Sequence, residues 1–177
     1  MHTQASILWR RLDRPGHDAC HLLRHAHGHT LQGLAVFLHD DGPAALAYTV
    51  DCAPDWTTRS ARVHGRIGPR TVDHAIAREP DAWVLDGARF PHLAHLPDID
   101  FGFTPATNLI QLRRVPLPLA EPVPIPVAWL DADSASLTEL PQVYERRGDA
   151  ELRYHAPTAG YEAIIRLTPD GFIHTYP

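Results

Sequence analysis

The chain has 177 residues, of which 44% are hydrophobic and 21% charged, as is typical of one soluble globular domain. Its formal net charge of −5 argues against a nucleic-acid partner and against simple adhesion to an anionic membrane surface. All 16 basic residues are arginine, which excludes lysine Schiff-base chemistry and a P-loop lysine.

The first half of the chain is predicted to be strands joined by short turns. Runs rich in apolar and β-compatible residues are separated by Gly, Pro and Asp turn sequences. Asp86-Gly87 is typical of a two-residue hairpin turn. In the fifth strand, Arg59, Ala61 and Val63 are expected on one face because side chains alternate along a strand. The expected strands are Ala5–Leu12, Ala19–His25, Thr30–His39, Ala44–Cys52, Thr57–Ile67, Arg70–Arg78, Ala82–Asp86 and Arg89–Leu93.

A polar segment follows, Asp98-Ile99-Asp100-Phe101-Gly102-Phe103-Thr104-Pro105-Ala106-Thr107-Asn108, and Arg113-Arg114 come shortly after it. In a strand, Asp98 and Asp100 would share one face. Thr104-Pro105 predicts a helix start, because Thr can act as N-cap and Pro is tolerated at the first helical position. The polar side chains of such a strand, turn and short helix can form a ligand site, or they can form the hydrogen bonds that a tight turn needs. Both interpretations stay open.

The second half begins with a proline-rich stretch, Val115–Pro126, which holds five prolines. It cannot be a central strand, because proline offers no N–H to the ladder, and it predicts a polyproline-like crossover. A plain connector and a docking site for a proline-recognising partner both remain open. Strands are then expected at Ala128–Asp131, Leu137–Arg147, Glu151–His155, Tyr161–Thr168 and Phe172–Tyr176.

Together these elements predict an all-β antiparallel fold of about a dozen short strands with one short helix. So many strands in a small domain would curl into a closed barrel, a sandwich or a wrapped half-barrel. We expect one domain over residues 1–177, either undivided or made of two β portions, 1–114 and 127–177, joined by the crossover 115–126.

The polar segment resembles the signature of a bacterial family described as "Putative glycolipid-binding". Further stretches carry the resemblance over almost the whole chain: Trp9-Arg10-Arg11, Pro15-Gly16-His17-Asp18, Cys52–Ser60, Pro141–Arg146, Gly171-Phe172-Ile173 and Tyr176-Pro177. The resemblance implies a fold similar to the periplasmic lipoprotein-localisation factors, with a strongly curved sheet that forms a half-barrel or barrel-like wrap around an apolar concave face. It also implies a lipid-like or glycolipid ligand.

Other chemistry finds little support in the motifs. His25, His27 and His29 alternate as zinc or copper ligands can, but Ala26 and Gly28 predict a hairpin tip that would separate the rings. No nucleotide-binding glycine motif and no G-x-S-x-G elbow occurs in the sequence. We therefore expect no metal and no cofactor.

An amphiphile site needs an apolar concave face and a few polar groups at its mouth. The apolar candidates are Val36, Phe37, Leu46, Tyr48, Trp83, Leu85, Ile164 and Leu167, and Trp9 and Trp129 are further candidates to stack on a sugar ring. Carboxylates and amides match vicinal hydroxyls of a sugar. The expected ligand-binding residues are Asp98, Asp100, Thr104, Thr107, Asn108, Arg113, Trp56, Arg59 and Tyr144.

The residues leave three functions possible. The preferred one is non-enzymatic binding of an amphiphile, a glycolipid or another lipid-like ligand. The second is an enzyme acting on a small polar substrate at the Asp98–Arg114 cluster, with Asp98 or Asp100 as general acid and Arg113 orienting an anion. The third is a protein-interaction scaffold that uses a sheet edge or the crossover.

The expected location is the cytoplasm. The first residues show no basic region followed by an apolar one, and no run approaches the ~18 apolar residues of a membrane span. Cys20 and Cys52 stand in no metal or redox motif, so we expect them to be reduced and buried.

Overall fold

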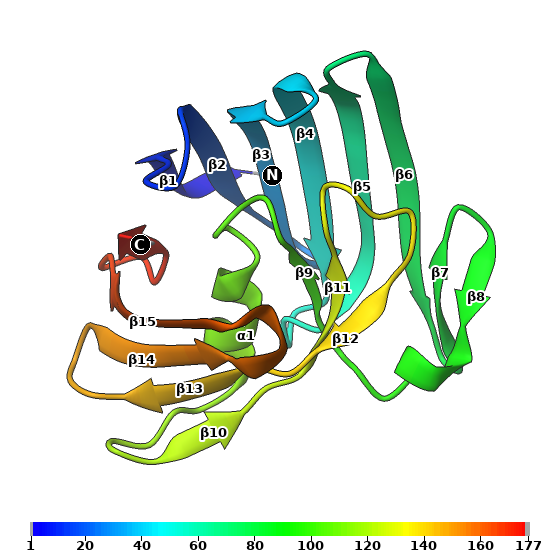
Figure 1. The fold of residues 1–177 in the computed structure, drawn as a ribbon. Coiled ribbons are helices and arrows are strands. Elements are labelled where there is room, and N and C mark those ends of the chain that lie inside the picture. Colours follow the sequence, from blue (N-terminus) through cyan, green and yellow to red (C-terminus); the bar gives the residue numbers. More distant parts are fainter. Residues whose placement is uncertain (1, 176–177) are drawn as a thin grey trace.

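The structure is a computed structural model that describes residues 2–175. The first half of the chain forms one eight-stranded sheet, in which each strand pairs antiparallel with the next along the chain (Figure 1). Each of the eight strands overlaps the stretch that the alternation and the turn residues predict for it. Their bounds are β1 (His2–Arg10), β2 (Gly16–His25), β3 (Gly28–His39), β4 (Gly42–Cys52), β5 (Thr58–Ile67), β6 (Arg70–Glu79), β7 (Ala82–Leu85) and β8 (Ala88–Phe90).

The hairpin between β7 and β8 has the geometry that its sequence predicts. Asp86 and Gly87 both have positive φ, 50° and 85°, and Leu85 pairs with Ala88 across the turn. A two-residue turn with two positive φ angles matches the twist of the flanking strands. The predicted strand Arg89–Leu93 is shorter than expected, because residues Pro91–Leu93 form the 3₁₀-helix η1.

The prediction for the faces of β5 is wrong at its first residues. Asp51 pairs with Ser60 but Cys52 pairs with Thr58, so Arg59 is an extra residue in the ladder, a β-bulge. The bulge shifts the alternation, and Thr58 is buried while Arg59 is exposed. From Ala61 onward the predicted alternation holds.

The crossover leads into a second, five-stranded sheet. Part of the crossover is itself a strand, β10 (Pro122–Pro124), which lies at the edge of that sheet and pairs only with β13. An edge is where proline is tolerated, because one side of the strand needs no donors. The other strands are β13 (Val143–Arg146), β14 (Glu151–Ala156), β15 (Tyr161–Leu167) and β16 (Ile173–Thr175), with the 3₁₀-helix η2 (Pro157–Ala159) between β14 and β15. Tyr176, the predicted end of the last strand, lies outside the described residues.

A third sheet joins the two halves of the chain. It contains β9 (Ile99–Phe101), β11 (Val127–Leu130) and β12 (Thr138–Leu140), and the predicted strand Leu137–Arg147 is divided between β12 and β13. β11 pairs with β9 in parallel, with Trp129 opposite Asp100. The antiparallel expectation is wrong for this pair, since the helix and the proline crossover together provide the long connection that parallel strands need.

The one α-helix, α1 (Asn108–Arg114), begins later than the Thr104-Pro105 pair predicts. Thr107 is the N-cap residue but makes no side-chain cap, because its hydroxyl donates to Asp100. The hydroxyl of Thr104 accepts the N–H of Ala106 at 3.1 Å and so stabilises a turn ahead of the helix.

Two hydrophobic cores form around these sheets. One lies between the eight-stranded sheet, β9, β11 and α1, and the other lies under the five-stranded sheet. Figure 1 shows α1 between the two sheets. The predicted fold class, all-β with one short helix, is confirmed, but the sheets stay open and are not strongly curled in residues 2–175. Neither α1 nor the two 3₁₀-helices has the length and apolarity to cross a membrane.

We predict that Gly33→Ala destabilises the fold by about 1–3 kcal/mol, because overpacking a filled core forces shifts of this cost. Gly33 is the cross-strand partner of Tyr48, and a Cβ there would overlap the Tyr48 ring and lie 2.6 Å from the carbonyl of Ala19. Urea denaturation measures the change. The matched control is Gly148→Ala, whose Cβ would meet nothing closer than 4.0 Å. Equal stability of the two variants would contradict the prediction.

Candidate functional site

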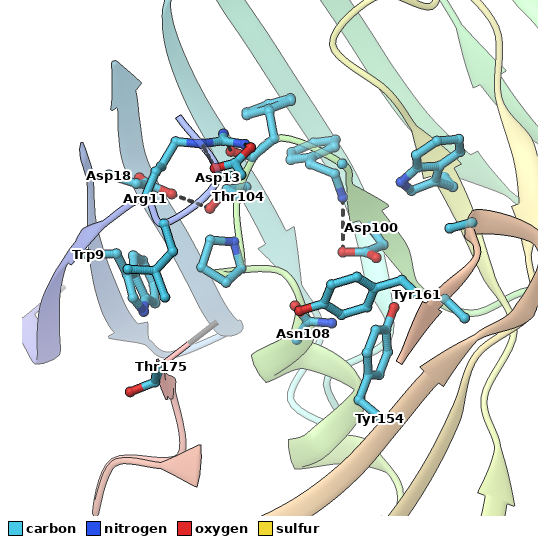
Figure 2. Close-up of a pocket in the computed structure, with 18 of the residues that line it drawn as sticks. Trp9, Arg11, Asp13, Asp18, Asp100, Thr104, Asn108, Tyr154, Tyr161 and Thr175 are labelled. Carbon is cyan, nitrogen blue, oxygen red and sulfur yellow. Dashed lines mark hydrogen bonds and ion pairs between the residues drawn. The ribbon is translucent and has the colours of Figure 1, made fainter. Parts of the chain in front are cut away.

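A cavity of about 620 Å³ lies between the β1–β2 edge of the large sheet, the polar segment and the five-stranded sheet (Figure 2). This volume is typical of small-molecule sites, which span about 300–1,000 Å³. Its wall combines aromatic and aliphatic side chains with charged and polar ones: Leu8, Trp9, Arg10, Arg11, Leu12, Asp13, Asp18, Asp100, Phe101, Gly102, Phe103, Thr104, Pro105, Asn108, Trp129, Leu140, Tyr154, Ala156, Ala159, Tyr161, His174 and Thr175.

The aromatic part of the wall is held in place by contacts behind it. The indole N–H of Trp9 donates to the carbonyl of Ile173 at 2.5 Å, which ties β1 to the five-stranded sheet. The rings of Phe101 and Phe103 stack with centroids 5.3 Å apart. Side chains fixed in this way form a pre-formed apolar surface rather than one that must rearrange for a ligand.

On one side of the cavity, Asp18 of β2 is buried and surrounded by donors. The Tyr48 hydroxyl donates to it at 3.0 Å, and the Thr104 hydroxyl donates to its other oxygen. Burial raises the pKa of Asp18 from 3.8 to about 6, although both hydroxyls and Arg11 oppose the rise. This carboxyl therefore connects β2, β4 and the turn before α1.

Elsewhere on the wall, Asp100 of β9 is also buried and also surrounded by donors. Its Oδ1 accepts from the Thr107 hydroxyl and from the N–H of Phe101, and its Oδ2 accepts from the amide of Gln142 at 2.8 Å. Burial raises the pKa of Asp100 to about 6 against the effect of these bonds. Figure 2 shows the two carboxyls at separate positions on the wall.

Asn108 extends the hydrogen-bond chain from Asp100. Its amide donates to the Tyr144 hydroxyl at 2.7 Å, and that hydroxyl donates to Oε1 of Gln142 at 3.3 Å. The first residue of α1, strand β13 and strand β9 are thereby linked through side chains alone. Such a chain orients each of its members, so the polar groups on the cavity wall are pre-arranged.

Arg11 stands at the edge of the cavity, and each of its three guanidinium nitrogens donates a hydrogen bond. It donates to both oxygens of Asp13 at 3.0 and 2.9 Å and to the carbonyl of Phe103 at 3.0 Å. It also lies over the ring of Phe37, 4.5 Å from the centroid. The hydrogen bond from Arg11 lowers the pKa of Asp13, so the pair stays charged.

The structure brings together only part of the set predicted from sequence. Asp100, Thr104 and Asn108 line the cavity. Thr107 and Tyr144 lie directly behind them, bonded to Asp100 and Asn108 respectively.

Asp98 lies away from the cavity and is fully buried. Arg114 binds it through two nitrogens, at 2.9 Å from Nε and 2.7 Å from Nη2. The carbonyl of Asp98 also accepts the N–H of Ala128, so this residue ties α1 to the β9–β11 pair.

The remaining predicted residues gather at another place. The Trp56 ring stacks on His29 with centroids 4.0 Å apart, and the guanidinium of Arg113 lies 5.9 Å from the Trp56 ring. Arg59 donates to the carbonyl of His27 at 2.9 Å. Neither these residues nor the eight apolar candidates, from Val36 to Leu167, line the cavity.

Sequence reasoning assigned no site role to Arg11, Asp18, Tyr154 or Tyr161, although all four line the cavity. A signal was available for two of them. Arg11 and Asp18 stand in the Trp9-Arg10-Arg11 and Pro15–Asp18 motifs that carry the family resemblance. Tyr154 and Tyr161 come from ordinary alternating strands, which give no such signal.

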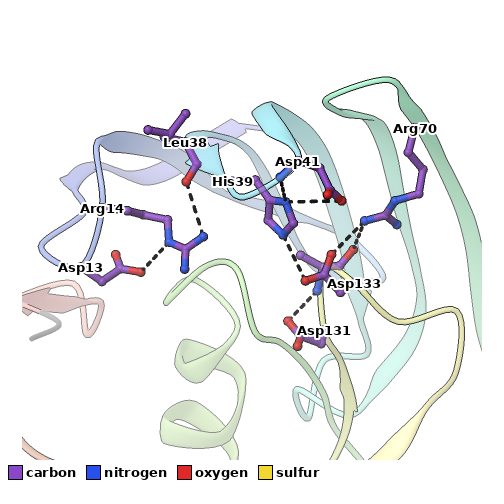
Figure 3. Close-up of polar contacts among 9 residues, drawn as sticks. Asp13, Arg14, Leu38, His39, Asp41, Arg70, Asp131 and Asp133 are labelled. Carbon is purple, nitrogen blue, oxygen red and sulfur yellow. Dashed lines mark hydrogen bonds and ion pairs between the residues drawn. The ribbon is translucent and has the colours of Figure 1, made fainter.

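A group of three potential metal ligands, His39, Asp41 and Asp133, lies at the end of the large sheet (Figure 3). The backbone N–H of Asp41 donates to Nδ1 of His39, so Nε2 carries the proton and donates to Asp133 at 3.0 Å. Arg70 also donates to Asp133. With both imidazole nitrogens and the carboxylate engaged, this group holds the loop after β11 against β3 and β6. The His25, His27 and His29 side chains belong to no such group in residues 2–175.

Comparison with known proteins identifies the family. A family model described as "Putative glycolipid-binding" matches residues 6–177. The chain belongs to this family. No curated protein matches it. A crystal structure of a DUF1089 family protein from Pseudomonas aeruginosa is similar, with a TM-score of 0.78 and 21% identity over 100% of this chain and 96% of that one. At this identity the likeness shows the fold alone.

We predict that Arg114→Ala destabilises the protein by about 3 kcal/mol, because it leaves the Asp98 carboxylate buried without a partner. Arg113→Ala is the matched control, since the Arg113 guanidinium donates to an exposed backbone carbonyl, that of Asp170. It should cost about 1 kcal/mol or less. Thermal and urea unfolding of both variants measure the difference, and equal losses would show that the Asp98–Arg114 pair is not a structural element.

We predict that Asp18→Asn removes a pH-dependent part of the stability. The folded pKa of Asp18 is raised from 3.8 to about 6, so its protonated form contributes stability that is fully present at about pH 4 and is lost as the pH rises through about 6. The free energy of unfolding of the wild type minus that of the variant should therefore fall by up to about 3 kcal/mol between about pH 4 and pH 7.

Urea denaturation across this range measures the Asp18 effect. Asp13→Asn is the control with the opposite sign, because the pKa of Asp13 is lowered and its stabilising effect grows as the pH rises. A wild-type advantage over Asp18→Asn that stays constant or grows with pH would contradict the assignment.

Proposed function

We propose that the protein binds an amphiphile, a glycolipid or another lipid-like molecule, in the 620 Å³ cavity and does not convert it chemically. One observation carries this proposal. The cavity combines a fixed aromatic wall with buried hydrogen-bonding groups that are held by their neighbours, which is the composition that an apolar ligand with a polar end requires. The description of the family supports the same function.

The polar end of the ligand is proposed to lie on Asp100 and Asn108. Asp100 accepts three hydrogen bonds from protein groups, whereas a carboxylate offers about four lone-pair positions, so one position can accept a ligand hydroxyl. The amide of Asn108 offers further bonding beside it. Adjacent hydroxyls on a sugar match such a pair, and Trp129 or Tyr154 offers a ring face for its apolar C–H side.

The apolar part of the ligand is proposed to lie toward Leu8 and Leu12. These two side chains line the cavity and are 70% and 52% exposed. A cavity of this size encloses a drug-sized portion of a molecule. A longer hydrocarbon chain would therefore extend past these leucines and cover them.

The structure gives less support to the other two functions that the sequence leaves open. The enzyme hypothesis placed the general acid at Asp98 or Asp100. Asp98 is fully buried and bound by Arg114 through two nitrogens. Asp100 lines the cavity but accepts three hydrogen bonds from protein groups, and Arg113, which was to orient an anion, does not line the cavity. The proline-rich crossover contains the edge strand β10, whose two prolines are exposed, and the hollow beside Pro122 has a volume of only about 50 Å³.

We predict that Ala156→Phe abolishes ligand retention by filling the cavity, since Ala156 is buried on its wall. Asn108→Ala should weaken retention about tenfold or more by removing a buried polar contact. Native mass spectrometry of protein purified without detergent, followed by organic extraction, measures the bound amphiphile. Ala150→Phe is the control, because Ala150 lies exposed in the turn before β14. Equal retention by the wild type and Ala156→Phe would contradict the proposal.

A further inference from the structure

The outer face of the large sheet, opposite its core, carries an exposed apolar patch over β1–β4. Leu8 pairs with Ala19, Ala19 with Leu34 and Leu34 with Ala47, so these four side chains form one row across four strands. Val36 and Leu38 follow Leu34 on the same face at every second residue of β3. We call Leu8, Leu34, Val36 and Leu38 the outer patch, and they are 70%, 47%, 45% and 51% exposed.

Two of the arginines that border the outer patch, Arg10 and Arg66, form no ion pair within residues 2–175. The neighbouring row runs from Arg10 through His17 and Val36 to Ala45 and Arg66, so one arginine stands at each end of it. Both arginines are exposed. Arg66 donates only to neutral oxygens, those of Thr71 and Pro69.

The two rows contain one carboxylate, Asp73, which pairs with His64 in the ladder. It already forms an ion pair with Arg62 at 2.8 Å. Although the chain carries a formal net charge of −5, these two rows are therefore apolar at their centre, and one of them has an arginine at each end. The exposed carboxylates Asp40 and Asp41 stand beyond Leu38, at the β3–β4 turn. An anionic surface would attract this face and repel the rest of the molecule, which fixes the orientation of approach.

The apolar and charged parts of the patch favour one kind of binding partner over others. A two-fold contact centred on the patch would set the border arginines of one copy near those of the other, which is unfavourable. A nucleic acid would satisfy the arginines but would not bury four aliphatic side chains. A bilayer with anionic lipids offers negative charge at its surface and an apolar interior below it, so it matches both parts of the patch.

The patch is also continuous with the cavity. Leu8 and Arg10 belong to the outer face of β1 and line the cavity as well. Figure 1 shows β1 and β2 at the edge of the large sheet that faces the end of the five-stranded sheet. A molecule that rests on this face therefore brings the rim of its cavity to the surface on which it rests.

We infer that the outer face of β1–β4 docks on the surface of an anionic phospholipid bilayer, with the outer patch inserted among the lipids and Arg10 and Arg66 at the headgroups. Docking through this face does not depend on which molecule occupies the cavity.

Vesicle flotation tests this inference. The wild type should float with vesicles of phosphatidylcholine and phosphatidylglycerol in equal parts and not with phosphatidylcholine alone, and raised salt should reduce its binding. Arg66→Glu and Leu34→Ser should each weaken flotation about tenfold or more, because an arginine near such a surface and a buried aliphatic group each contribute on this order.

Matched controls come from the five-stranded sheet. Arg166, whose side chain is 73% exposed, and Ile164, which is 49% exposed, lie on β15, so Arg166→Glu and Ile164→Ser should float like the wild type. Unchanged melting of all four variants confirms that they fold.

Three results would overturn the inference. One is a wild type that does not float with anionic vesicles, and another is Arg66→Glu and Leu34→Ser floating as the wild type does. The third is a wild-type dimer in sedimentation that Leu34→Ser converts to monomer, since the patch would then be an interface between copies. Ligand retention, measured separately, should not change in Arg66→Glu, so failure of docking and failure of cavity binding are distinguishable.

Discussion

Two buried carboxyls hold the segment between β9 and α1 in place, and the cavity depends on them. Asp18 binds this segment through Thr104 to the large sheet. Asp100 binds it through Thr107 to β9 and, through Gln142, to the loop before β13. Burying a carboxyl is costly unless donors surround it, and here hydroxyl and amide donors surround both. The segment is thereby fixed from two sides, and the space next to it is not closed by the collapse of either sheet.

The two hydrophobic cores explain why a space exists at all. One core belongs to the large sheet and α1, and the other to the five-stranded sheet. They approach each other along the polar segment, where hydrogen bonds replace apolar packing. Trp9 closes the remaining side of the cavity. Its indole N–H donates to the carbonyl of Ile173, which lies 164 residues away along the chain. A cavity at the meeting of two cores, with polar anchors in its wall, suits a ligand that is itself partly apolar and partly polar.

The strands could be predicted from the sequence because alternation and turn residues are local properties. The start of α1 could not, because Thr104 and Thr107 use their hydroxyls on Asp18 and Asp100 rather than on the helix N-terminus, and Asp18 lies 86 residues away from Thr104. Likewise, two adjacent arginines on a helix point about 100° apart, and only tertiary position decides that Arg114 and not Arg113 meets Asp98. Part of the polar wall of the cavity could be predicted from one short segment, whereas Tyr154 and Tyr161 come from ordinary strands and reach the cavity only through folding.

The central claim is that the cavity holds an amphiphile with its polar end on Asp100 and Asn108. A high-resolution crystal structure of the protein, purified without detergent and crystallised with its extracted ligand, tests this claim most directly. The account predicts continuous density in the cavity, with polar atoms at hydrogen-bond distance from Asp100 and Asn108 and an apolar chain that leaves past Leu8 and Leu12. Ordered water alone in the cavity, with the ligand bound elsewhere on the surface, would contradict it.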